Sequence, residues 1–202
     1  MRLTVRERRT NVTLDMTNHE QLVLLLATRS ARRGNFTLAS GRQSSLYIDA
    51  RLTTMTPDGQ RLIGQLGLEA IRAANWKADA VGGLTLGADP FAYAICHSSA
   101  GSEHPIRAFT VRKEPKAHGT GKQVEGPVAA GDRVVIVEDV ITTGGSASRA
   151  VEAVRREGVI PLAILALVDR QEGGRETLEA LGLPVHALAT ASEILPLIAT
   201  TA

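Results

Sequence analysis

The 202-residue sequence is poor in cysteine and in aromatic residues: it has one cysteine, Cys96, and only three Phe, two Tyr and one Trp. A single cysteine cannot form an intrachain disulfide and fits a reducing compartment, so a cytoplasmic location is expected. So few aromatic side chains cannot build a base-stacking surface. A net charge of +2 also argues against a nucleic-acid partner. The longest purely apolar run, 162–168, is too short to span a membrane, so no membrane association is expected.

Several catalytic and metal-binding patterns are missing as well. The sequence has no Cys-x-x-Cys or His-x-x-x-His spacing, which makes a structural zinc site improbable. It has no Gly-x-Ser-x-Gly elbow, so serine hydrolysis has no support. It also lacks the Gly-Lys-Ser/Thr signature of nucleotide hydrolases.

Hydrophobic patterning from residue 80 onward predicts alternating strands and helices. The apolar runs 134–137 and 162–168 do not alternate with polar residues, so both faces of these strands should be covered, as in a parallel sheet flanked by helices. Ligands of such sheets bind at the carboxyl ends of the strands. The expected strands are 80–84, 106–111, 133–137, 161–168 and 185–189, and the expected helices are 89–99, 145–157, 175–181 and 192–198.

The first part of the chain has a different pattern. A capping box from Thr17 to Glu20 predicts a helix that ends at about residue 30, and a strand pair or extended segment follows over 36–51. Pro57 opens a second helix. We treat residues 1–17 as an N-terminal arm, a frayed and solvated terminus, with a basic arm that contacts phosphate as the alternative. Residues 18–202 are expected to form a single domain.

The strongest functional signal is the stretch from Val134 to Ala147. A hydrophobic strand, 134–137, delivers two adjacent carboxylates, Glu138 and Asp139, to its carboxyl end. The Thr-Thr-Gly-Gly-Ser run 142–146 then opens a helix, where turned amides, hydroxyls and the helix N-terminus can together hold a phosphate. The carboxylates suit hydroxyl groups, or a metal ion bound to hydroxyls. The ligand that meets both requirements is a sugar phosphate.

A second polar segment, 112–127, is predicted to be a long loop. Its first part is rich in cationic side chains, and Gly119 and Gly121 give it hinge freedom. Such a loop suits a ligand whose diphosphate must be covered and then released. Taken without the motif at 134–147, a solvated charged loop would be the better interpretation.

The stretch Val134–Ala147 resembles the motif that binds phosphoribosyl diphosphate (PRPP) in type I phosphoribosyltransferases. The Arg-Lys-x-x-Lys-x-His-Gly run at 112–119 resembles the catalytic loop of the orotate phosphoribosyltransferases in particular. Segments 36–42 and 47–49, and the Val-Asp-Arg-Gln run at 168–171, are similar to other parts of that family. The resemblance therefore spans most of the chain, from about residue 36 to 171.

The resemblance implies a fold and an activity. The fold is the α/β type I phosphoribosyltransferase fold, a central and mostly parallel sheet flanked by helices, with a small hood built largely from the N-terminal segment. The hood would be mainly 18–56 and the core about 57–202. The activity is transfer of ribose 5-phosphate from PRPP to orotate, giving orotidine 5-monophosphate and diphosphate, in pyrimidine biosynthesis. Mg²⁺ is the expected cofactor, bound through PRPP near Glu138 and Asp139 with no direct protein ligand.

The resemblance also implies roles for individual residues. Lys113, Lys116, His118 and Asp139 would be catalytic, and Thr142 and Arg170 would bind orotate, Arg170 as a fork for its carboxylate. The PRPP-binding residues would be Arg112, Lys113, Lys116, His118, Glu138, Asp139, Val140, Ile141, Thr142, Thr143, Gly144, Gly145 and Ser146. A homodimer is expected, in which loop 112–126 is shared across the interface.

Two departures from the family pattern concern cationic residues. Many members carry Lys where Ala39 stands, and many carry a Tyr-Lys pair in the segment that here is 82–90; the amides of residues 85–87 are expected to serve instead. Two alternatives stay open. One is a phosphoribosyltransferase for another nucleobase, against which the loop at 112–119 argues. The other is a PRPP-binding regulator that binds nucleic acid without catalysis, against which the loop and the balanced charge argue.

Overall fold

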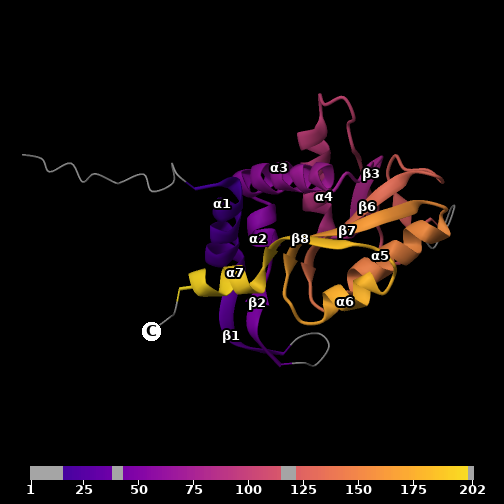
Figure 1. Cartoon of the computed structure of the whole chain (residues 1–202). Helices are drawn as coiled ribbons and strands as arrows, with labels where there is room; N and C mark the ends of the chain where they lie inside the picture. The colour runs from indigo at the N-terminus through magenta and orange to yellow at the C-terminus, as the bar shows by residue number, and fades with distance from the viewer. Residues whose placement is uncertain (1–15, 38–42, 115–121, 200–202) are drawn as a thin grey trace, which may run out of the picture.

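The computed structural model describes residues 16–37, 43–114 and 122–199, and its core is a six-stranded sheet (Figure 1). The strands lie in the order β5-β4-β3-β6-β7-β8, and all neighbours are parallel except β4 and β5. The mostly parallel sheet predicted from the sequence is thus confirmed. The strands are β3 (Ala80–Leu84), β4 (Arg107–Val111), β5 (Val124–Glu125), β6 (Arg133–Ile141), β7 (Ile160–Asp169) and β8 (Val185–Thr190).

Helices cover both faces of this sheet, which explains the unbroken apolar runs in β6 and β7. One buried cluster joins α1, α3, α4 and α7 to one face, and a second joins α5 and α6 to the other. Within the described residues, no helix is long and apolar enough to cross a membrane. The helical elements are α1 (Asn18–Leu25), the π-helical turn η2 (Leu26–Ser30), α2 (Arg51–Thr54), α3 (Pro57–Ala73), α4 (Ala88–Ser99), α5 (Gly145–Arg156), α6 (Gly174–Glu179), α7 (Ala191–Ile194) and the 3-10 turn η3 (Leu195–Leu197).

Two helices begin where the sequence places their caps. The Thr17 hydroxyl accepts the N–H of Glu20 at 3.2 Å, and the Glu20 carboxylate accepts the N–H of Thr17 at 2.7 Å, so the capping box of α1 is formed. At α3, Thr56 is the N-cap and Pro57 occupies the first turn. Residues 1–15 of the expected N-terminal arm lie outside the described residues.

A separate hairpin stands beside the main sheet. β1 (Ala31–Thr37) and β2 (Gln43–Ile48) pair antiparallel, with Ala31 opposite Ile48, and the chain then enters the short helix α2 (Figure 1). The expected strand pair is confirmed, although β1 begins at Ala31 rather than near residue 36. The first residues of β1 are largely polar and gave no strand pattern; pairing with β2 makes them a strand.

Strand β6 is longer than expected, and this difference positions the site. The sequence predicts a strand that ends at Val137, but β6 continues to Ile141 because β7 supplies partners: Glu138 lies opposite Ala166 and Ile141 opposite Asp169. Glu138 and Asp139 are therefore strand residues. Successive side chains of a strand leave it on opposite faces, so Glu138 and Asp139 leave β6 on different sides, and both line a cavity at its carboxyl end.

Candidate active site

A cavity of about 340 Å³ lies at the carboxyl ends of β3 and β6. This is the edge of the sheet where the topology predicts ligand binding. Five separate parts of the chain meet there, so the site exists only in the folded protein. The lining residues are 47–51 from the end of β2 to the start of α2, 84–87 from the end of β3 to the start of α4, Lys113 after β4, 138–140 of β6, and Ser146 and Arg149 of α5.

Asp139 lies on the α4 side of β6. Its carboxylate packs so closely on Gly87 that a Cβ at that position would clash with both carboxylate oxygens and would displace the Asp139 side chain. The Oδ1 atom accepts the N–H of Val140 at 2.9 Å. Asp139 also lines the cavity, which leaves it able to accept a hydrogen bond from a ligand.

Glu138 lies on the α5 side and is almost completely buried, with 6% of its surface exposed. Burial, and then the charge of Asp139 and a hydrogen bond with it, raise the pKa of Glu138 well above the ordinary value, while Arg149 acts in the opposite direction. Its Oε2 has no hydrogen-bond partner among the described residues. An unpaired buried carboxyl oxygen is costly, and a hydroxyl group of a ligand in the cavity would satisfy it.

The segment between β6 and α5 forms a left-handed turn at the start of the helix. Gly144, the N-cap of α5, has φ +83°, and a Cβ there would lie 2.9 Å from the carbonyl oxygen of Gly174, so only glycine fits. Gly145 differs, because a Cβ at that position would meet open space apart from the Thr143 hydroxyl at 3.8 Å. The helix therefore presents its first amides to an open volume, which is the arrangement that binds phosphate.

The residues predicted around this turn contribute in different ways. Ser146 lines the cavity, and Val140 lines it from β6. The side chain of Ile141 is buried in the core, so its backbone is the part available to a ligand. Thr142 is half-buried and Thr143 is exposed.

Of the predicted loop residues, Lys113 reaches the cavity. Arg112 does not line it, and its guanidinium lies 3.7 Å from the Glu125 carboxylate instead. Lys116 and His118, together with Ala39 of the segment after β1, lie outside the described residues. The structure thus brings Lys113, but not Arg112, to the carboxylates of β6.

Arg170 lies at the end of β7 and is buried. Its backbone N–H donates to the carbonyl of Ile141 at 3.1 Å, which places it beside Thr142. Its Nη2 lies 2.7 Å from the carbonyl of Leu46 in β2 and 2.7 Å from the carboxylate of Glu172. Arg170 therefore ties the hairpin to the main sheet. Its Nε is buried without a hydrogen-bond partner among the described residues.

Several cavity residues were missing from the sequence-based site. Arg51 donates to Asp49 at 2.8 Å, and this contact lowers the pKa of Asp49 and raises that of Arg51, on which Asp139 also acts. The alternation of polar and apolar residues predicts that the side chains of 47, 49 and 51 lie on one side of an extended segment. It does not predict that this side faces the site. Arg149 had no signal, since an exposed arginine on an amphipathic helix is ordinary.

The amides expected to replace the missing lysines are only partly available. The N–H of Thr85 donates to the carbonyl of Val111 at 2.9 Å, so it is already used in the sheet edge. The Thr85 hydroxyl donates to Asp89 at 2.6 Å. Leu86 and Gly87 line the cavity, and their amides are the remaining candidates.

Comparisons with known proteins agree with this geometry. Residues 55–180 match the model of the phosphoribosyl transferase domain. The orotate phosphoribosyltransferase of Aquifex aeolicus is 45% identical over 183 residues, which is 89% of this chain and 99% of that protein. A crystal structure of the Mycobacterium tuberculosis orotate phosphoribosyltransferase with PRPP has a TM-score of 0.74 at 38% identity, covering 88% of this chain and 99% of that one. A structure of the same enzyme with Fe(III) dicitrate has a TM-score of 0.77 at 40% identity, with the same coverage of both chains.

Proposed function

The chain belongs to the orotate phosphoribosyltransferases of the phosphoribosyltransferase family, and we propose that the cavity at the carboxyl ends of β3 and β6 is where PRPP and orotate react. One observation carries this proposal: the two carboxylates of β6 line the same cavity as the start of α5. A sugar phosphate needs both kinds of group within one molecule's length.

The reaction is a substitution at C1 of the ribose. The bond from C1 to the diphosphate oxygen breaks, and the diphosphate leaves with the bonding electrons. A bond from C1 to a ring nitrogen of orotate forms, and the proton of that nitrogen is released to solvent or to the diphosphate. Positive charge develops on the sugar in between. Positioning and electrostatic stabilisation therefore carry the rate, and no covalent intermediate with the protein is needed.

The groups of the site match the parts of PRPP. The amides and hydroxyls of 142–146, at the N-terminus of α5, hold the 5-phosphate. Glu138 and Asp139 accept hydrogen bonds from the ribose hydroxyls, and Asp139 also favours the positive charge on the sugar. The unpaired Oε2 of Glu138 supports this role, because a bound hydroxyl would give it the partner it lacks.

The leaving diphosphate is neutralised by the cationic loop. Lys113 lines the cavity and makes no ion pair with any described residue, which supports its role as a partner for an anion. Lys116 and His118 follow it in the sequence and act on the same group, and Arg112 assists from the base of the loop. Arg149 adds a cation on the opposite wall, from α5.

Orotate is held beside the end of β7. Arg170 and Thr142 are neighbours across the β6–β7 register, which supports a shared contact with the base. The Nε–H of Arg170 is a buried donor in need of an acceptor, and a carboxylate or carbonyl oxygen of orotate is suited to it.

Mg²⁺ fits the site through PRPP rather than through a protein cage. The described residues contain no group of three or more His, Cys, Asp or Glu side chains that could hold a metal ion. Two carboxylates do line the cavity, one of them with an unpaired oxygen, and oxygen donors suit Mg²⁺. When bound, Mg²⁺ neutralises charge on the diphosphate; Glu138 and Asp139 would face it.

We further propose a homodimer that works in the cytoplasm. Four exposed large apolar side chains lie close to the cavity in sequence: Leu52 on α2, Met55 directly after α2, Leu86 on the connection before α4, and Tyr93 on α4. These elements border the cavity, so a second copy seated on them would place its own loop 112–126 close to this site. The single cysteine suits a reducing compartment.

Loss of orotate absorbance tests the function directly. With PRPP and Mg²⁺ we expect orotate to be consumed and diphosphate to appear in equal amounts, while adenine and uracil are not turned over. Turnover of adenine or uracil alone would contradict the proposal. Salt-sensitive nucleic-acid binding without orotate turnover would favour the regulator instead.

A further inference from the structure

The base of the cationic loop is closed by two hydrogen bonds between its ends. The N–H of Arg112 donates to the carbonyl of Gln123 at 2.9 Å, and the side-chain amide of Gln123 donates to the carbonyl of Arg112 at 2.8 Å. Lys113 is the first residue beyond this closure and lines the cavity. The position of Gln123 thus sets where the loop leaves the sheet.

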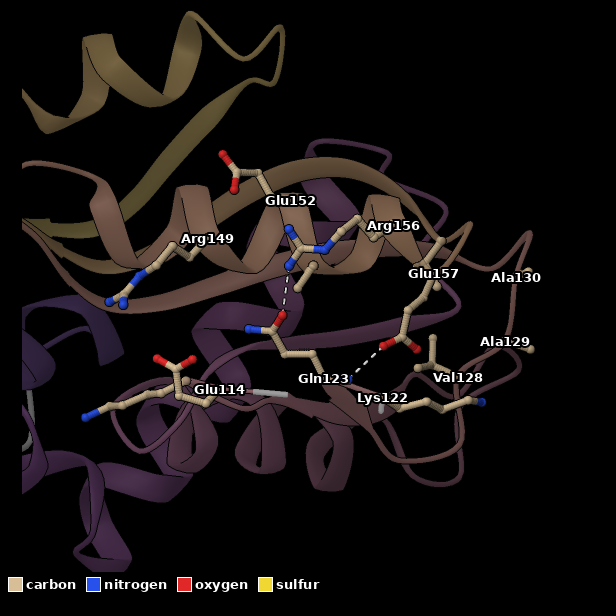
Figure 2. A pocket seen from close by; sticks show the side chains of 13 residues that line it. Glu114, Lys122, Gln123, Val128, Ala129, Ala130, Arg149, Glu152, Arg156 and Glu157 are labelled. Carbon is tan, nitrogen blue, oxygen red and sulfur yellow. Dashed lines mark hydrogen bonds between the residues drawn. The ribbon is translucent and has the colours of Figure 1, made fainter. Parts of the chain in front are cut away.

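Gln123 is in turn held by the C-terminal end of α5. The Glu157 carboxylate accepts the N–H of Gln123 at 3.0 Å, and the Arg156 guanidinium donates to the side-chain oxygen of Gln123 at 2.8 Å (Figure 2). The same carboxylate also accepts the N–H of Val124 at 3.0 Å. We call Gln123, Arg156 and Glu157 the loop clamp. These three residues line a cavity of about 890 Å³. This cavity shares two lining residues, Lys113 and Arg149, with the active-site cavity.

Helix α5 connects the clamp to the phosphate-binding turn. Its first residue, Gly145, belongs to that turn, and its last, Arg156, belongs to the clamp. Twelve helical residues span about 18 Å, and five buried residues fix this helix against the sheet. One rigid element therefore sets the distance between the groups that hold the 5-phosphate and the base of the loop that reaches the diphosphate.

Helix stability alone does not account for Glu157. It is the C-cap of α5, where a negative charge is unfavourable next to the negative end of the helix dipole, whereas Arg155 and Arg156 are favourable there. The carboxylate makes two hydrogen bonds to the loop base, which offset that cost. Its position is explained by the contact with the loop.

We propose that Glu157 and Arg156 are positioning residues for catalysis, which fix the base of the cationic loop relative to the phosphate-binding turn through α5. The proposal rests on the proposed role of the loop in neutralising the diphosphate. Neither residue touches substrate: they act through Gln123 on the placement of Lys113 and the residues that follow it.

The test compares Glu157→Ala with Glu157→Gln and with Glu152→Ala. Glu152 lines the same cavity from α5 but points away from Gln123, so it is a matched control (Figure 2). For Glu157→Ala we expect faster hydrogen exchange at the amides of Gln123 and Val124. We also expect kcat to fall by about 10- to 100-fold with the KM for orotate little changed, as misplaced catalytic groups give. Glu157→Gln keeps an acceptor oxygen and should recover most of kcat.

Two further measurements keep the outcomes distinct. Arg156→Ala changes an exposed residue, so the fold is retained, and it should lower kcat less than Glu157→Ala because one contact of the clamp is lost. The proposal would be overturned if hydrogen exchange were unchanged in Glu157→Ala, or if exchange were faster but kcat unchanged. An equal loss of kcat in Glu152→Ala would also overturn it. Failure of the loop's role itself would show as wild-type turnover in Lys113→Ala, whatever the exchange data.

Discussion

The two edges of the central sheet treat their charged groups in opposite ways. At the amino ends of the strands, Asp79 accepts the N–H of Arg133 at 2.7 Å, and the guanidinium of Arg107 lies 3.0 Å from the Asp132 carboxylate. At the carboxyl ends, Glu138 Oε2 and Arg170 Nε are buried without a partner among the described residues. Within the described residues, the unpaired buried atom near the amino edge is the Ser102 hydroxyl, whereas at the carboxyl edge the unpaired atoms belong to charged side chains.

This difference distinguishes charged residues that stabilise the fold from charged residues that bind a ligand, which a count of charged residues at each edge would not do. Buried atoms of charged side chains are nearly always hydrogen-bonded, so unpaired ones on Glu138 and Arg170 at the carboxyl edge indicate where a ligand completes the structure. Lys113 and Arg149, on two walls of the active-site cavity, likewise make no ion pair within the part of the chain that the structure describes.

The largest expected effect comes from exchanging a carboxylate for an amide at each edge. Asp139→Asn should lower kcat by about 100-fold or more, because a charge aimed at the developing positive sugar is lost. Asp79→Asn should leave kcat unchanged and lower the free energy of unfolding by no more than about 1 kcal/mol, as for an exposed pair. Steady-state kinetics and thermal unfolding measure both. Equal losses of activity in the two variants would erase the distinction between the edges.

At Glu138, a substitution is expected to raise stability and to lower turnover, and the loss of turnover should be smaller than at Asp139. Because the pKa of Glu138 is raised in the folded state, the unfolded chain ionises first as pH rises through the ordinary carboxyl value of 4.5, and wild-type stability falls above that pH. Glu138→Gln removes this loss, so it should be more stable than wild type at pH 7, with little difference at pH 4. Its turnover should drop about tenfold through the weaker ribose contact.

Thermal unfolding of the two proteins between pH 4 and 8 checks this prediction. A stability gain that does not grow with pH would show that Glu138 is not held against ionisation. Wild-type turnover in the variant would remove Glu138 from the ribose contact.

Local patterns predicted most of the fold, and the exceptions depend on tertiary pairing. The capping box at Thr17, the helix start at Pro57 and the apolar runs of β6 and β7 are local signals, and the structure confirms them. The two-residue strand β5 lies inside the predicted loop and exists because Val124 pairs with Val111 of β4. The extension of β6 through Glu138 depends on β7, which no local pattern shows.

The candidate site was predictable where it is contiguous in sequence. The carboxylates and the glycine-rich turn follow one another in a single stretch and were found from it, whereas Asp49, Arg51 and Arg149 reach the cavity only through folding. Arg170 was predicted as a free fork for orotate, but contacts with Leu46 and Glu172 already engage its Nη2. Such competition among partners cannot be seen in a sequence.

The central claim is that the turn at the start of α5 holds the 5-phosphate of PRPP. Gly145→Val tests it most directly, because Gly145 is exposed and a Cβ there would meet only the Thr143 hydroxyl, at 3.8 Å. When PRPP is titrated into the protein in the presence of Mg²⁺, calorimetry should detect saturable heat with wild type and none with Gly145→Val. Both proteins should unfold at similar temperatures. Equal PRPP affinity in the two proteins would contradict the account.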